Sequence, residues 1–111
     1  MKSYTDLSQS KKLAEILPIE SADMCYPLPC EDGDKPLLEQ GGFGSTPCWS
    51  LAALLDILDY PQLSKDKLGS GKEGWMVSVY PDNCRYDSCW HDNPIDCCIE
   101  MIIKLHEQKI L

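Results

Sequence analysis

The stretch DNPIDCCIEMIIKLHE, residues 92–107, decides the fold of this chain. Asn93 has the side chain of a helix N-cap, Pro94 follows where a missing amide hydrogen costs nothing, and Asp96 lies at the positive end of the helix dipole. A series of side chains then recurs at helical spacing, namely Ile95, Cys98, Ile99, Ile102, Leu105 and His106. The pattern predicts a C-terminal helix with one long buried face.

The segment before this helix has the pattern of a β-hairpin. In WMVSVY, residues 75–80, Trp75, Val77 and Val79 alternate with side chains of the opposite face. PDN, residues 81–83, is a turn signal, and CRYDSCW, residues 84–90, alternates well enough to return as an antiparallel strand. We therefore expect the C-terminal helix to lie across this hairpin.

A second helix is predicted within GGFGSTPCWSLAALLDIL, residues 41–58. Thr46 has the side chain of an N-cap and Pro47 is suited to the first helical position. An apolar stripe follows, formed by Leu51, Leu54, Leu55 and Leu58. Pro61 stops the helix at about Tyr60. This stripe belongs to the core.

The remaining segments complete the fold class. Asp6 and Gln9 have the spacing of a capping box and open a first helix over residues 7–17. Prolines make residues 21–30 an extended or edge segment. The polar, glycine-containing residues 62–74 predict an exposed, mobile connection. We expect one α+β domain over residues 1–111, with three helices on a β-hairpin or short antiparallel sheet, in the order α, extended, α, β, β, α.

Composition limits the function classes. The chain has 111 residues, enough for one modest core, and its 18 acidic against 10 basic residues give a net charge of −8. This charge opposes binding to nucleic acid, because no surplus of cations faces the phosphates. The sequence holds no apolar run long enough for a membrane span and no apolar secretion signal, so we expect no membrane association and a cytoplasmic protein. The 7 cysteines are then expected to be reduced thiols.

Three blocks carry a resemblance at the family level: SADMCY (21–26), PCWSLAALLDIL (47–58) and DNPIDCCIEMIIKLHE (92–107). In this order they resemble a group of small uncharacterised proteins from phages, prophages and mobile elements of gut Bacteroidetes. The similarity extends over nearly the whole chain. It implies a genetic context rather than a chemistry, namely an accessory protein that binds a component of the host, in the host cytoplasm if the protein is phage-encoded.

Cys48 is the one candidate nucleophile. The sequence around it is similar to the nucleophile turn of papain-like cysteine peptidases, where cysteine and tryptophan begin a buried helix. At a helix start the dipole lowers a thiol pKa, His91 is then the candidate base, Asn93 or Asp87 would orient it, and Gln40 would supply an oxyanion donor. The glycine that precedes the cysteine in that family is absent, so we expect Cys48 to be structural and the protein not to be an enzyme.

The glycine-rich loop offers an alternative function. Gly42, Gly44, Ser45 and Thr46 precede the predicted helix start, where backbone amides can hold a phosphate. A protein that sequesters a small nucleotide-type signalling molecule is therefore an alternative reading. The loop lacks the spacing and the lysine of a Walker motif, so we expect it to serve mainly as an entry into the helix.

Metal binding has a weaker basis. Cys84, Cys89, His91, Cys97 and Cys98 are zinc ligand types. The gap between the first two is longer than a zinc-knuckle turn, and neighbouring positions on a helix diverge by about 100°. We expect no metal and no other cofactor.

The last candidate is an interaction surface. Tyr80, Arg85, Tyr86 and Trp90 are expected to cluster around the end of the predicted hairpin, and tyrosine, tryptophan and arginine supply many of the strongest contacts in protein interfaces. We expect a non-catalytic protein that binds a host protein through this surface. The open edge of the hairpin is also compatible with a homo-oligomer.

Overall fold

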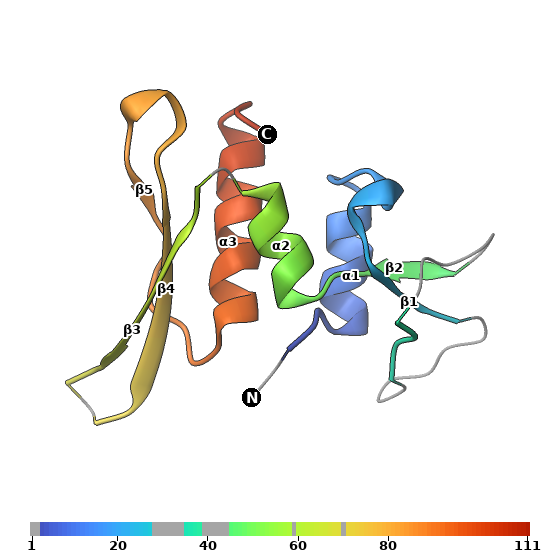
Figure 1. Ribbon diagram of the computed structural model, residues 1–111, viewed down its shortest axis with the longest axis horizontal. Helices are drawn as coiled ribbons and strands as arrows, with labels where there is room; N and C mark the ends of the chain where they lie inside the picture. Colours follow the sequence, from blue (N-terminus) through green and yellow to red (C-terminus); the bar gives the residue numbers. More distant parts are fainter. Residues whose placement is uncertain (1–2, 28–34, 39–44, 59, 70) are drawn as a thin grey trace.

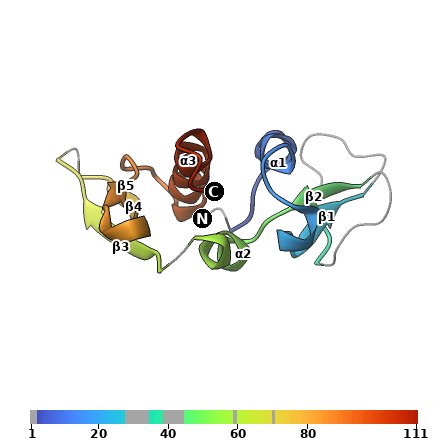
Figure 2. The ribbon, with the colours of Figure 1, turned by 90° about the horizontal axis from the view of Figure 1, so that it is seen from above.

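Three helices lie between two small antiparallel sheets, and the sheets form opposite ends of the molecule (Figures 1 and 2). The structure is a computed structural model that describes residues 3–27, 35–38, 45–58, 60–69 and 71–111. The molecule is flattened, with extents of 41 × 34 × 19 Å. The predicted α+β class and the three helices are confirmed. The predicted order is wrong in part, because it places one sheet where the chain forms two.

The elements follow one another in an order that keeps each sheet local in the chain. They are α1 (Leu7–Ala14), a 3-10 turn η1 (Ile19–Ser21), β1 (Met24–Tyr26), β2 (Thr46–Cys48), α2 (Leu51–Ile57), β3 (Gln62–Lys67), β4 (Glu73–Val79), a 3-10 turn η2 (Pro81–Asn83), β5 (Tyr86–Asp87) and α3 (Pro94–Glu107).

Helix α1 begins as the sequence predicts. The Asp6 carboxylate accepts from the Gln9 N–H at 2.7 Å, and the Gln9 side chain accepts from the Asp6 N–H at 3.1 Å. This reciprocal pair satisfies two amides that a helix start leaves without partners. The helix ends at Ala14, three residues before the predicted Leu17, and a turn continues to Pro18.

The predicted start of the second helix is wrong. Thr46, Pro47 and Cys48 form strand β2, which pairs antiparallel with β1. Cys25 is opposite Pro47 in this ladder, but its N–H and C=O both bond to Leu37 on its other side, at 3.0 and 2.7 Å. Position 47 therefore needs no amide hydrogen, and proline fits a strand there as well as it would fit a helix start.

Helix α2 begins at Leu51, with Ser50 as its N-cap. The Ser50 hydroxyl accepts from the Ala53 N–H at 3.2 Å, and the Asp23 carboxylate accepts from the Ser50 N–H at 2.9 Å. Asp23 thus ties the helix start to the segment before β1. Because both oxygens of Asp23 bind Ser50, residue 50 is a better cap than Thr46, which is four positions earlier.

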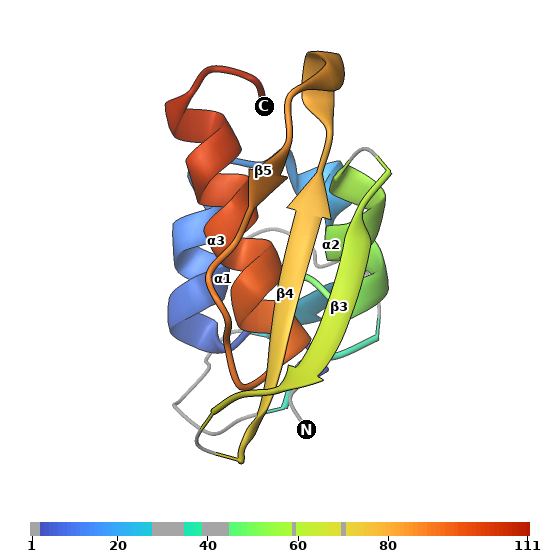
Figure 3. The same cartoon turned by 90° about the vertical axis from the view of Figure 1, so that its left-hand side faces the viewer.

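The second sheet has the order β3–β4–β5, and its face is seen in Figure 3. The predicted strand at residues 75–80 lies within β4 except for Tyr80, and Trp75, Val77 and Val79 face the core as the alternation predicts. Residues 62–74 are exposed for the most part, as predicted, but β3 within them is a regular edge strand. It pairs with β4 along its whole length, and the exposed Lys65 adds an ion pair with Glu73 at 3.1 Å and a contact over the Trp75 ring.

The return strand is much shorter than the predicted residues 84–90. Tyr86 and Asp87 pair with Val79 and Ser78, whereas His91 pairs with Trp75. The second pairing is displaced by one residue from the first, so the chain contains a bulge between them. The side-chain alternation predicted for this segment therefore breaks after Asp87.

Helix α3 packs against β4 on one side and α2 on the other, and Asn93 caps it as predicted. The predicted stripe is buried except for His106, which is exposed. Burial extends beyond that stripe to Cys97 and Met101, because the helix lies between the sheet and the other two helices (Figure 2). Trp49, fully buried, joins the same core, and its indole N–H donates to the Ser21 hydroxyl at 3.0 Å.

Within the described residues, none of the helices combines the length and the apolar character that a membrane span requires.

Replacing Leu54 with alanine tests this packing. Leu54 is fully buried between α2 and α3, so Leu54→Ala should lower the free energy of unfolding by about 2–5 kcal/mol. Leu38→Ala is the control, because the Leu38 side chain is 86% exposed and its removal should change stability by less than about 0.5 kcal/mol. Chemical denaturation of both variants measures the difference. Equal losses would show that the α2 face is assigned wrongly.

A candidate binding groove beside α3

Cys48 lies in the interior and not at a helix start. It is fully buried on β2 next to Met24 and Tyr26, in a small apolar cluster separate from the main core. Its thiol donates to the Thr5 carbonyl at 3.3 Å and accepts from the Thr5 hydroxyl at 3.4 Å. Burial raises the pKa of the Cys48 thiol, and the hydrogen bonds around it offset this only in part. The prediction that a helix dipole acts on Cys48 is therefore wrong, and the reactive thiolate is disfavoured.

The structure does not bring the predicted hydrolase residues together. His91 precedes α3, and its Nε2 lies 2.9 Å from the Glu100 carboxylate. Asn93 serves as the α3 cap. Strand β2 lies on the far side of α1 from α3 (Figures 1 and 2), so Cys48 and His91 belong to different parts of the molecule. Gln40 lies outside the described residues.

The predicted phosphate loop is described only at its end. Gly42 and Gly44 lie outside the described residues. Ser45 and Thr46 lead into strand β2, and α2 begins five residues after Thr46. The expectation that the loop enters a helix directly is therefore wrong, because a strand intervenes.

The four predicted interface residues are divided between two ends of the sheet. Tyr80 and Arg85 flank the η2 turn, and the Arg85 guanidinium binds the Asp87 carboxylate at 2.8 Å. Tyr86 packs against the core. Trp90 is 41% exposed but follows the bulge, beside the Trp75–His91 pair at the other end of β4. These four residues are close together in the sequence, but the pairing with β4 places them at two different ends of the sheet.

A groove of about 620 Å³ runs along the outer face of α3, and it is the feature that the sequence did not reveal. Helix α3 forms its floor, α1 contributes one side and the loop after β5 the other. Nine residues line it, namely Gln9, Cys89, His91, Asp96, Ile99, Glu100, Ile103, Lys104 and Glu107. Most of its exposed lining is apolar, with Ile99 and Ile103 one helical turn apart.

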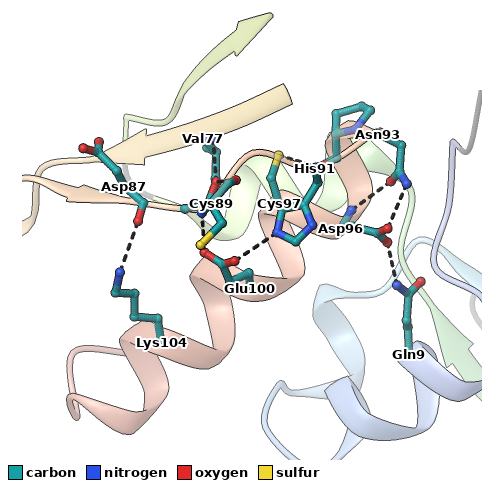
Figure 4. A network of polar contacts seen from close by, with 12 residues as sticks. Gln9, Val77, Asp87, Cys89, His91, Asn93, Asp96, Cys97, Glu100 and Lys104 are labelled. Atoms are coloured by element: carbon teal, nitrogen blue, oxygen red, sulfur yellow. Dashed lines mark hydrogen bonds and ion pairs between the residues drawn. The ribbon is translucent and has the colours of Figure 1, made fainter. Parts of the chain in front are cut away.

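Glu100 joins the loop to the helix at one side of this groove (Figure 4). One carboxylate oxygen lies 2.9 Å from His91 Nε2, and the other accepts from the Cys89 N–H at 2.7 Å. Burial raises the pKa of the Glu100 carboxyl, but the bonds from His91 and Cys89 outweigh this, so the pKa lies below its usual value. Glu100 is therefore ionised near neutral pH and fixes the position of the loop.

Gln9 and Asp96 are the two lining residues of the groove that join α1 to α3. Each is the third residue of its helix, and the Gln9 amide donates to the Asp96 carboxylate at 2.7 Å. Asp96 also accepts from the Asn93 side chain at 2.8 Å, while Gln9 completes the α1 capping box with Asp6. The caps of two helices distant in sequence thus form one hydrogen-bonded network (Figure 4).

Within the described residues, the cysteines considered as zinc ligands do not form a metal-binding cluster. Cys84 and Cys89 are exposed, whereas Cys97 and Cys98 are buried in α3. The Cys97 thiol donates to the Pro94 carbonyl at 3.0 Å. Among the residues that the structure describes, no group of three or more His, Cys, Asp or Glu side chains could hold a metal ion.

No known protein family, curated protein or solved structure matches this chain.

The sequence contains part of the signal for the groove. The sequence predicts roles for three of the groove's residues, namely a capping box for Gln9, a place at the helix dipole for Asp96 and a candidate base in His91. It does not predict that Gln9 bonds to Asp96 or His91 to Glu100. Ile99 and Ile103 have the spacing of adjacent turns, and only the packing of α1 and the loop on either side distinguishes a groove from an ordinary helix face.

Thiol labelling tests the placement of Cys48. Under native conditions near neutral pH, iodoacetamide should label Cys84 and Cys89, whose side chains are exposed. Cys48 should react only after unfolding, because it is fully buried and its thiol pKa is raised. Peptide mapping by mass spectrometry identifies the labelled sites. Labelling of Cys48 ahead of the two exposed thiols would contradict this placement.

Replacing Gln9 tests the shared cap network. Gln9→Ala removes one bond within the α1 cap and the bond to Asp96, and should destabilise the protein by about 1–2 kcal/mol. Lys11→Ala, an exposed change on the same helix, should have little effect. In a double-mutant cycle, Gln9→Ala and Asp96→Ala should show a coupling of about 0.5 kcal/mol or more. Additive losses would mean that the two caps act independently.

Proposed function

We propose that this protein acts by binding a partner protein, and that the groove beside α3 is the surface it uses. The observation that carries the proposal is the composition of the groove. Most of its exposed lining is apolar, while Glu100 and Asp96, which also line it, are already bound by neighbouring side chains and amides. Such a surface offers area to a partner and holds its polar groups rigid, which favours recognition over chemistry.

For the biological setting, our proposal rests on the resemblance of the sequence to proteins of phages and mobile elements. We propose an accessory protein whose partner is a host protein met in the host cytoplasm. The surface predicted from Tyr80, Arg85, Tyr86 and Trp90 is replaced in this proposal by the groove, because those side chains are divided between two ends of the sheet.

A pull-down with matched variants tests this function. The tagged protein is incubated with lysate of a gut Bacteroidetes host, and captured proteins are quantified by mass spectrometry. Ile103→Asp puts a charge on the groove floor, and should reduce capture of the partner by at least about tenfold. Ile19→Asp is the control, because Ile19 is 50% exposed, lies on η1 and does not line the groove.

Both variants must show the circular dichroism spectrum and melting temperature of a folded protein. A partner that is captured equally by wild type, Ile103→Asp and Ile19→Asp would place the binding surface elsewhere. Absence of any specifically captured protein would contradict the proposed function itself.

A further inference from the structure

We propose that the partner segment received by the groove is a basic amphipathic helix of about three turns, a proposal that rests on the proposed function. Three observations point to this occupant: the length and apolar floor of the groove, the state of the backbone groups around it, and the charges along its rim.

The floor matches one face of a helix. Lining residues on α3 extend from Asp96 to Glu107, which corresponds to about 16 Å along the helix axis. Ile99 and Ile103 lie within this length at the spacing of successive turns. A partner helix that presents apolar side chains at every third or fourth position would cover the half-buried Ile103 and the exposed edge of Ile99, which is 8% exposed.

The backbone around the groove favours a helix over an extended peptide. An extended segment gains affinity by pairing with unused backbone N–H and C=O groups. Here the Cys89 N–H bonds to Glu100, and the His91 N–H and C=O both bond to Trp75, at 2.8 and 2.6 Å. The floor and the other wall are helices whose backbone bonds are internal. A helix satisfies its own backbone and needs only side-chain contacts.

The rim selects for positive charge. The groove is lined by three carboxylates, of Asp96, Glu100 and Glu107, and by one lysine, Lys104, which donates to the Asp87 carbonyl at 3.1 Å. His91 is paired with Glu100. The chain as a whole carries a charge of −8, so a basic partner is also attracted over a longer range.

The test uses a synthetic probe in place of the unidentified partner. The probe is a peptide of about 16 residues with leucines on one helical face and lysines elsewhere, long enough to form a marginal helix by itself. One comparison peptide has the same composition in an order that removes the apolar face, and a second replaces lysine with glutamate. Binding is followed by titration, and its location by NMR shifts of the backbone amides of the protein.

We expect the amphipathic basic peptide to bind with shifts concentrated on α3, and both comparison peptides to bind at least about tenfold more weakly. Glu107→Lys should weaken binding by about threefold or more. Glu15→Lys, an exposed change near the end of α1 with the same effect on net charge, should weaken it less than about twofold. Ile103→Asp should abolish the α3 shifts.

Equal affinity for the reordered peptide, shifts away from α3, or equal effects of Glu107→Lys and Glu15→Lys would each overturn the proposal. Glu107 is exposed, so its variant remains informative even where Ile103→Asp is unstable. The two proposals fail separately. If the peptide does not bind but capture from lysate still depends on Ile103, the groove binds a partner of another kind; if capture is also independent of Ile103, the groove is not the binding surface.

Discussion

The fold depends on the burial of α3 from two directions. Its inner side covers Val77 and Val79 of the sheet, while its other sides meet α2 and, through the bond between Asp96 and Gln9, the first turn of α1. Without α3, the three-stranded sheet and the two short helices α1 and α2 would each leave apolar surface in contact with water. Helix α3 is therefore the element on which both halves of the molecule assemble, and the strip that carries Ile103, Lys104 and Glu107 is the part of it left partly exposed.

The N-terminus of α3 is held by more than its own cap. Gln9, which closes the capping box of α1, also binds Asp96, so the two helix starts share one network. A capping bond is local and forms whenever its helix forms. The bond between the two caps forms only when α1 and α3 are packed correctly, so it adds a stabilising contribution that is specific to the native arrangement.

Local signals in the sequence predicted the helices better than the sheets. The α3 and α1 caps, the alternation of β4 and the turn at residues 81–83 follow from interactions between residues close in sequence, and they are present. The strand Thr46–Cys48 could not be predicted, because Thr-Pro before an apolar run suits a helix start, and the competing cap at Ser50 depends on Asp23, distant in sequence. The bulge before His91 could not be predicted either, because the sequence alone does not show where the pairing with β4 shifts by one residue.

The candidate groove was the hardest feature to predict, for a related physical reason. Residue types with obvious chemistry, such as Cys48 and His91, are the first candidates for function in a sequence. In this structure Cys48 is hydrogen-bonded to Thr5 and His91 to Glu100, so both side chains stabilise the fold. The proposed binding surface is a mainly apolar strip with charged side chains beside it, and each of its residues is ordinary for a helix. Because the polar side chains nearest the floor are held by their neighbours, the proposed partner would be recognised by the shape of the strip and by the charges along it. This is a property of packing, which no single motif carries.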